Sequence, residues 1–379
     1  MAVKIIVGGD FCVTPQYSSE NLFSEEVIRL FSQSDINIIN LECPVINEGN
    51  TDKIVKTGPH LSTNKAVFKQ LKKINIHAVT LANNHILDFG SKGIATTIEE
   101  CLQNNILTTG AGENNELAAK PTIIEKNGLR IALVNFCEHE FSIATTSSAG
   151  ANPLDIIDNL KIIKFARTMA DFVLVIIHGG HEHYNLPSPR MVKQYRFFAE
   201  NGADAVIGHH THCISGYEIH NKVPIFYSLG NLLFTMQCDY KGWNNGLLVK
   251  LEVQKGFPLK WDLIPTQQSK ENFHLSISGK EDREKVMDEI SSYSKIISDS
   301  EKLNNSWISF ALKMESQILN DFSPINLFPG RYVKSILRRS GLNKFIFRKK
   351  YLIPILNSIE CESLNDLSQF ILNLKSKEQ

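Results

Sequence analysis

The fold is decided by two similar stretches of sequence, Phe172-Val-Leu-Val-Ile-Ile-His178-Gly-Gly-His181-Glu182-His183 and Ala203-Asp-Ala-Val-Ile-Gly208-His209-His210-Thr211-His212. Each is a short, very apolar run followed by a histidine cluster, and such runs are typical of buried parallel strands. Together they hold six of the twelve histidines. Any one of them alone would be interpreted as a surface or core residue. Two clusters at strand ends instead predict a functional site, because open α/β sheets place their chemistry there.

Strand-like and helix-like segments alternate around these stretches. Apolar strand runs are expected at residues 3–7, 36–41, 78–82, 172–177 and 203–207, with further β structure at 217–219, 223–227 and 247–253. Helical spacing is expected at residues 24–32, 64–74, 91–104, 155–170 and 190–200. Residues 121–136 predict a hairpin that turns at Asn127-Gly128. The β-α-β alternation predicts a mainly parallel sheet covered by helices, with antiparallel hairpins added.

The character of the sequence changes after about residue 270, where helical periodicity dominates. We therefore expect one domain of residues 1–268 and a helical C-terminal extension of residues 269–379. Residues 331–350 include eight Lys or Arg and no acidic residue, interleaved with apolar side chains. Such a basic amphipathic segment could lie on an anionic membrane surface, grip an acidic polymer, or be only the solvated face of a helical subdomain.

Composition limits the classes of function. The formal net charge of zero argues against a nucleic-acid partner. The seven cysteines are odd in number, scattered and free of C-x-x-C pairs, which favours reduced thiols. The N-terminus lacks a signal-peptide layout, and no apolar run approaches the ~18–20 residues that span a bilayer. We therefore expect a cytoplasmic location, and if residues 331–350 lie on a membrane surface, peripheral contact at the inner membrane.

Polar side chains follow five of the expected strands. They are Asp10, Glu42, Asn84 with His85, His178, and the pair His210 and His212. This mixture of carboxylate, amide and imidazole suits two adjacent divalent ions such as manganese, iron or zinc. A two-metal centre polarises a substrate oxygen and supplies hydroxide at neutral pH. Either carboxylate could bridge the metals, and His85 could protonate the leaving group.

Taken together, the motifs resemble the CapA family of bacterial capsule and poly-γ-glutamate synthesis proteins. They occur in the family's order over roughly residues 3–265: Gly-Asp10, Asn40-Leu-Glu42, Ala82-Asn-Asn-His85-x-x-Asp88-x-Gly90, His178-x-Gly-x-Glu182, Gly202-Ala-Asp204, Gly208-His-His-Thr-His212 and Tyr227-Ser-Leu-Gly-Asn231. The family is similar in turn to the calcineurin-like metallophosphoesterases. The resemblance implies a four-layer α/β/β/α sandwich with a two-metal site.

The resemblance also implies roles for individual residues. The implied metal ligands are Asp10, Glu42, Asn84, His178, His210 and His212. His85 matches the histidine that assists the leaving group, and Asp88 would orient it. Glu182, His181, His209 and Asn231 are expected to contact substrate. One departure is that Asp10-Phe-Cys12 stands where the phosphoesterases have Asp-x-His, so we expect an altered first metal position.

These expectations define a function and two alternatives. The favoured hypothesis is a divalent-metal-dependent hydrolase or transferase in capsule or surface-polymer biosynthesis. It would act on a phosphate ester or an amide of an acidic polymer or phosphorylated glycan, alongside other capsule-synthesis partners. The first alternative is a non-catalytic polymer-binding or assembly subunit that retains the metal site. The second is a general cytosolic phosphodiesterase.

Overall fold

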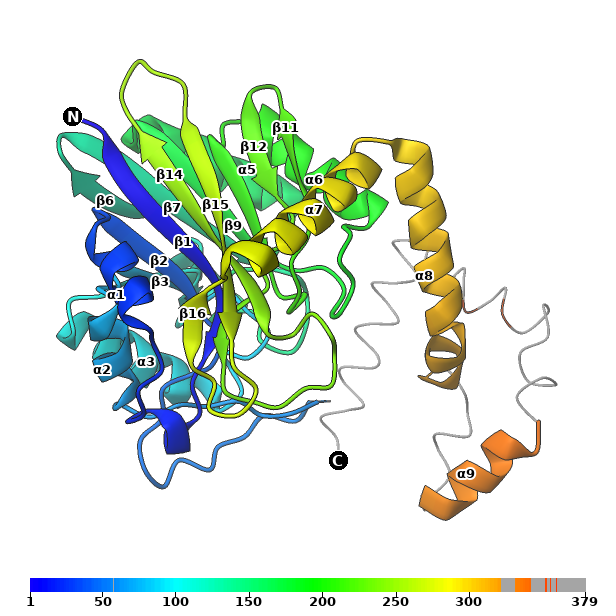
Figure 1. Ribbon diagram of the computed structural model, residues 1–379. Coiled ribbons are helices and arrows are strands. Elements are labelled where there is room, and N and C mark those ends of the chain that lie inside the picture. Colours follow the sequence, from blue (N-terminus) through cyan, green and yellow to red (C-terminus); the bar gives the residue numbers. More distant parts are fainter. Residues whose placement is uncertain (57, 322–330, 342–351, 353–354, 356–358, 360–379) are drawn as a thin grey trace. The chain divides into compact units, whose positions relative to one another are not determined.

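The computed structural model describes residues 1–56, 58–321, 331–341, 352, 355 and 359 (Figure 1). The chain divides into two compact units, residues 1–307 and 308–379. The expected domain boundary at 268/269 lies inside the first unit. The reason is that β16 (Leu275–Ile277) pairs with β15 (Lys260–Gln268), and α7 (Lys280–Ile297) buries Val286 and Ile290 in the core of that unit.

Two β-sheets form the centre of the first unit. The first sheet has eight strands in the order β16-β15-β14-β1-β2-β3-β4, and β13 also pairs with β1. Its remaining strands are β1 (Val3–Cys12), β2 (Ile36–Leu41), β3 (Ala78–Thr80), β4 (Leu107–Thr109), β13 (Asn231–Phe234) and β14 (Asn245–Val253). Strands β1 to β4 run parallel to one another, as the β-α-β pattern predicts.

The second sheet has six strands in the order β11-β12-β10-β9-β7-β6. They are β6 (Thr122–Lys126), β7 (Leu129–Cys137), β9 (Phe172–His178), β10 (Ala205–His209), β11 (Tyr217–His220) and β12 (Val223–Phe226), and a separate pair is formed by β5 (Ala111–Gly112) and β8 (Gly150–Ala151). The predicted hairpin is confirmed, because β6 and β7 are antiparallel and both turn residues, Asn127 and Gly128, have positive φ.

Helices cover the outer face of each sheet. The first sheet packs on α1 (Glu25–Ser32), α2 (Val67–Lys73) and α3 (Gly90–Gln103), and the second on α5 (Ile156–Met169) and α6 (Pro189–Glu200). Short elements are the 3-10 helix Pro15–Tyr17 and α4 (Asn115–Ala118). A third core lies between the sheets, where β1 and β2 meet β7, β9 and β10. The expected four-layer α/β/β/α sandwich is therefore confirmed.

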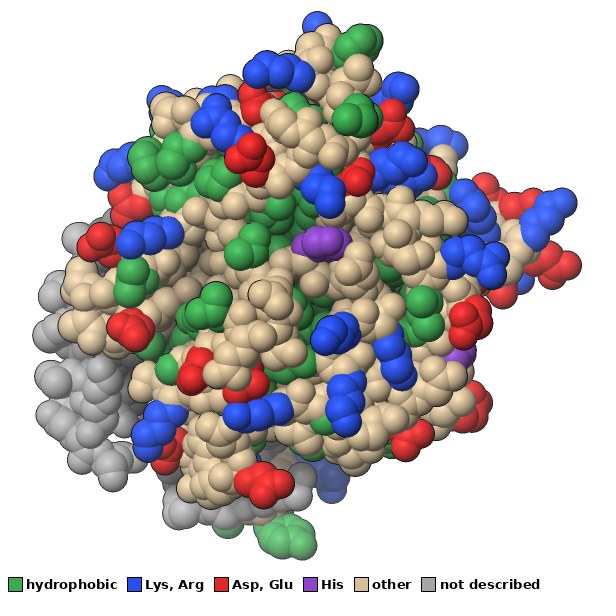
Figure 2. Space-filling view, turned by 90° about the vertical axis from the view of Figure 1, so that its left-hand side faces the viewer, with side chains coloured by type: hydrophobic (Ala, Val, Ile, Leu, Met, Phe, Trp, Pro, Cys, Tyr) green, Lys and Arg blue, Asp and Glu red, His purple; other side chains and the backbone are tan. Residues whose placement is uncertain are grey.

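The surface is of mixed charge. On the face seen in Figure 2, acidic and basic side chains are interspersed around scattered apolar ones, in keeping with the formal net charge of zero.

Helix α8 (Ser300–Asp321) begins in the first unit and ends in the second, and α9 (Arg331–Arg339) belongs to the second unit. Residues 342–350 of the expected basic segment lie outside the described residues. None of the helices in the described part of the chain is both long and apolar enough to span a bilayer.

Candidate metal centre

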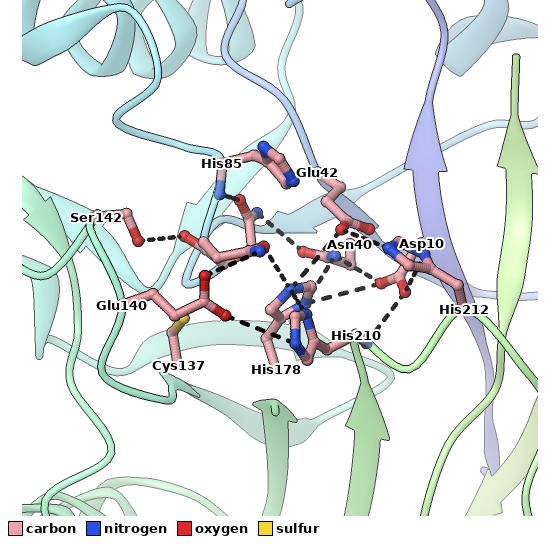
Figure 3. A network of polar contacts seen from close by, with 12 residues as sticks. Asp10, Asn40, Glu42, His85, Cys137, Glu140, Ser142, His178, His210 and His212 are labelled. Carbon is pink, nitrogen blue, oxygen red and sulfur yellow. Dashed lines mark hydrogen bonds and ion pairs between the residues drawn. The ribbon is translucent and has the colours of Figure 1, made fainter. Parts of the chain in front are cut away.

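Five of the six side chains expected to bind metal lie close together at one edge of the sandwich (Figure 3), and the sixth, Asn84, contacts His178. Asp10, Glu42 and Asn84 lie at or beyond the carboxyl ends of β1, β2 and β3 in the first sheet. His178 ends β9, and His210 and His212 follow β10 in the second sheet. The two sheets present their carboxyl ends at the same edge, so segments far apart in sequence contribute to one cluster.

His178 is at the centre of this cluster. Its Nε2 is 3.0 Å from Asn84 Oδ1 and 3.0 Å from His210 Nδ1. The same nitrogen is 3.8 Å from Glu42 Oε1, which in turn is 3.5 Å from His212 Nε2. Two groups of donor atoms could each hold one ion: Glu42 with His178 and His210, and Asp10 with Glu42 and His212. Glu42 belongs to both groups, so it would be a ligand shared by two ions.

Glu42 shows why these residues fit a cation. It is fully buried, and neither carboxylate oxygen has a hydrogen-bond donor among the described residues. Burial, followed by the charge of nearby Asp10, raises the pKa of Glu42 well above its usual value. An ionised carboxylate without a partner is costly in a protein interior. A divalent cation would supply the missing partner.

The histidines are in the form that binds metal. Burial, reinforced by neighbouring imidazoles, lowers the pKa of His178 well below its usual value. Burial likewise lowers the pKa of His212. The two rings are therefore neutral at pH 7, and a neutral imidazole is the species that coordinates a metal ion. Neutral imidazoles beside an unpartnered carboxylate fit a divalent metal of intermediate hardness.

Two asparagines hold these side chains in place. Asn40 donates from Nδ2 to Asp10 Oδ1 at 2.7 Å. Asn231 Oδ1 lies 2.9 Å from His212 Nδ1, and its Nδ2 donates to the carbonyl of Trp243 at 3.0 Å. Because the Asn231 amide nitrogen is already donating, its oxygen accepts the Nδ1 proton of His212. The other ring nitrogen of His212 then faces Glu42 with a free lone pair.

His85 belongs to a second network next to the cluster. Its Nδ1 is 2.8 Å from Asp88 Oδ2, so the orienting contact expected from the sequence is present. Asp88 is fully buried, accepts from the backbone of Leu61 at 2.7 Å, and forms an ion pair with Lys56. Lys56 Nζ also lies 3.1 Å from His85 Nδ1. Lys56 was not expected from the sequence, because it lies in a long loop without periodicity.

Glu140 is a further site residue that was not expected from the sequence. Its Oε2 accepts from Asn84 Nδ2 at 3.4 Å, and its Oε1 is 3.6 Å from His210 Nε2 (Figure 3). The side chain is 38% exposed, so it lies at the open side of the cluster. The sequence could have indicated Glu140, because this residue closely follows the end of β7, as the other site residues follow the ends of their strands.

Of the four side chains expected to contact substrate, two are buried. His209 is fully buried, in register with His178, and its ring nitrogens have no partner among the described residues. Asn231 is also buried and is held by His212 and Trp243.

The other two side chains expected to contact substrate lie on the loop after β9. Glu182 is exposed, and its charge acts on Glu42 and His212. The ring of His181 packs against Trp307, with 4.7 Å between ring centroids.

Cys12, at the position of the phosphoesterase histidine, is buried among apolar side chains. A contact with Cys43, together with burial, raises the pKa of the Cys12 thiol well above its usual value. Neither of the two donor groups found in the described part of the chain includes it. The altered first position thus lacks a side-chain ligand at residue 12.

Two facing sheets with carboxylate, amide and imidazole side chains at their strand ends define a four-layer α/β protein with a candidate metal centre. Residues 5–236 match the family described as "Bacterial capsule synthesis protein PGA_cap". The chain belongs to this family, which confirms the resemblance seen in its motifs.

The chain is 32% identical over 259 residues to "PGA biosynthesis protein CapA" of Bacillus subtilis (strain 168), over 67% of this chain and 66% of that one. It is 30% identical over 264 residues to "Capsule biosynthesis protein CapA" of Bacillus anthracis, over 67% of this chain and 62% of that one. The similarity therefore spans slightly less than two thirds of each relative's length.

Solved structures show a more distant likeness. One is a hypothetical protein from Thermus thermophilus, with 13% identity, a TM-score of 0.44, and coverage of 70% of this chain and 100% of that chain. Another is the 5'-nucleotidase from Candida albicans, with 11% identity, a TM-score of 0.39, and coverage of 69% and 51%. At these scores the likeness carries no argument about activity.

Proposed function

We propose that this chain is a divalent-metal-dependent hydrolase or transferase of capsule or surface-polymer synthesis. Its substrate would be a phosphate ester or an amide bond of an acidic polymer or phosphorylated glycan. The observation that carries the proposal is Glu42, a buried carboxylate that is shared by two groups of potential ligands and has no hydrogen-bond donor among the described residues. Membership of the capsule synthesis family supports the assignment to polymer synthesis.

The chain's own residues suit such chemistry. When bound, two divalent ions would polarise a substrate oxygen and lower the pKa of water. Asp10, Glu42 and Asn84 from one sheet, with His178, His210 and His212 from the other, would hold them. His85 would give a proton to the leaving oxygen or nitrogen from Nε2, since its Nδ1 faces Asp88. Asp88 and the loop that carries Lys56 would keep that ring in place.

The metal content of the purified protein tests this proposal. We expect about two ions per chain when the protein is prepared with manganese, iron or zinc. Glu42→Ala and His210→Ala should lose them. Glu218→Ala is the matched control, because Glu218 is also largely buried but is already paired with Arg196. Protein that stays metal-free, with no change in melting temperature on adding these ions, would overturn the proposal.

Activity is tested separately from metal binding. With metal retained, His85→Gln should lower turnover of poly-γ-glutamate or of a phosphodiester by about 10²–10⁴-fold, the usual contribution of a general acid. Retention of full turnover would remove His85 from the mechanism.

A non-catalytic role in polymer assembly is the second candidate. Two observations favour it: the buried Cys12, which neither donor group of the described residues includes, and a relative from Mycobacterium tuberculosis named "Probable polyglutamine synthesis accessory protein". That relative is 25% identical over 230 residues. Metal-loaded wild-type protein that binds poly-γ-glutamate but turns over neither substrate would support this candidate over catalysis.

A further inference from the structure

Helix α9 in the second unit presents large apolar side chains to solvent. Tyr332 is 86% exposed, Ile336 68% and Val333 45%. Exposed apolar side chains that are clustered on one element mark an interaction surface more often than scattered ones do.

The apolar and basic positions of α9 are on opposite sides of the helix. At about 100° per residue, the positions of Tyr332, Val333, Ile336 and Leu337 fall within an arc of about 140°. The positions of Arg331, Lys334, Arg338 and Arg339 fall within an opposite arc of similar width. The helix contains no acidic residue. It therefore combines a continuous apolar stripe with a purely basic one.

This combination selects one kind of partner. A soluble polyanion would pair with the basic arc but would leave the apolar arc in water. An anionic lipid surface satisfies both, because its headgroups attract Lys and Arg while the acyl boundary takes up apolar side chains. With nine residues, α9 is much shorter than the ~20 residues that cross a bilayer. A helix of this kind lies in the plane of the interface.

We propose that α9 is a docking surface for an anionic lipid bilayer, with Tyr332, Val333 and Ile336 facing the acyl boundary and the basic arc facing the headgroups. The proposal does not depend on the metal centre or on any catalytic activity. A helix this short has little stability in water by itself, so binding should be reversible and should weaken as salt screens the headgroup charge. Such docking would bring the sandwich to a membrane without inserting it.

The experiment uses the full chain and sedimentation with vesicles. Vesicles of phosphatidylcholine and phosphatidylglycerol in equal parts are compared with pure phosphatidylcholine. We expect binding to the anionic vesicles only, lost at high salt. Ile336→Asp should reduce the partition coefficient at least about tenfold, since it places a charge in the apolar arc. The double variant Arg338→Glu, Arg339→Glu should reduce it at least as much.

Ile157→Asp is the matched control. Ile157 is 69% exposed on α5 in the first unit, nearly the same exposure as Ile336, and should bind vesicles like the wild type. Circular dichroism and melting temperature confirm folding of each variant. The proposal is overturned if wild-type protein does not bind anionic vesicles or binds neutral ones equally. It is also overturned if Ile336→Asp binds like the wild type, even when the Arg variant does not, because a polyanion grip would then be the explanation.

Discussion

Replacing Glu42 by Gln should have opposite effects on the metal-free and the metal-loaded protein. The carboxylate is fully buried and has no hydrogen-bond donor among the described residues. In metal-free protein its charge is therefore a cost, and the neutral amide of Gln removes it. In metal-loaded protein the same change removes a ligand shared by both groups of donors. One substitution thus separates a metal-binding carboxylate from a merely structural one.

The size of the effect follows from the burial of Glu42. The neutral amide carries no charge to desolvate, so above the raised pKa of Glu42 the metal-free Glu42→Gln variant should be more stable by about 1.4 kcal/mol for each pH unit by which folding raises that pKa. For a large domain each kcal/mol shifts the melting temperature by about 2–4 °C. Metal affinity should fall by more than about 100-fold, because even the loss of an outer partner of a ligand costs 10–100-fold.

The pH dependence gives a second readout in chelated protein. The pKa of Glu42 is raised on folding, so the folded state binds the extra proton above the ordinary glutamate pKa of about 4.3. The metal-free wild type should therefore lose stability, relative to Glu42→Gln, as pH rises from about 4.3 through the raised pKa. The difference should be smallest in acid and largest once Glu42 is ionised.

Differential scanning calorimetry with and without chelator, together with titration calorimetry for metal, measures both effects. Glu218→Gln is the control, because Glu218 accepts from Arg196 and Tyr227. That variant should be less stable than the wild type and should bind metal normally. The reasoning about Glu42 fails if metal-free Glu42→Gln is destabilised, or if it still binds metal with wild-type affinity.

Three further predictions concern the surroundings of Glu42. Asn231→Ala should weaken metal binding by about 10–100-fold in titration calorimetry, because it frees the ring of His212, whereas a substrate-binding role would leave metal affinity unchanged. His209→Leu should keep its metal and stay within about 1 kcal/mol of wild-type stability by chemical denaturation, while His210→Leu should lose metal; loss of metal in both would place His209 among the ligands. Adding manganese or zinc to chelated wild type should raise the melting temperature in proportion to the logarithm of free metal above Kd, and a flat response would contradict a metal site in the folded state.

Much of the site could be predicted because strand ends are visible in sequence. Asp10, Glu42 and His178 each follow or end an apolar run, and parallel strands bring such ends to one edge. Roles within a cluster were harder to predict. His209 and His210 are adjacent, yet one is sealed beside β9 while the other adopts a φ of 96° and turns into the site. Spacing alone does not show where a strand stops and its loop begins.

Other features of the site and fold were not predicted, for different reasons. The Asn40-Leu-Glu42 motif was visible in the sequence, but Asn40 is part of a buried strand, so its hydrogen bond to Asp10 is visible only in the structure. Lys56 reaches Asp88 from a long loop, and loop conformation depends on tertiary contacts rather than on periodicity. The expected boundary at 268/269 assigned α7 to the C-terminal extension. The helical pattern of α7 in the sequence does not show that Val286 and Ile290 pack in the core between the sheets.

The distribution of the potential ligands over both sheets has a consequence for how fast the protein is degraded in a cell. Three of the clustered side chains come from β1, β2 and β3, and three from β9 and β10, so bound ions would join one half of the sandwich to the other. Without ions, that edge holds two buried acidic groups, Asp10 and Glu42, whose proximity raises the pKa of Glu42, and no ion joins the sheets. We expect chains made under metal starvation to open there first and to be degraded sooner. A pulse-chase half-life that is the same in metal-replete and metal-starved cells would contradict the expected dependence of degradation on metal supply.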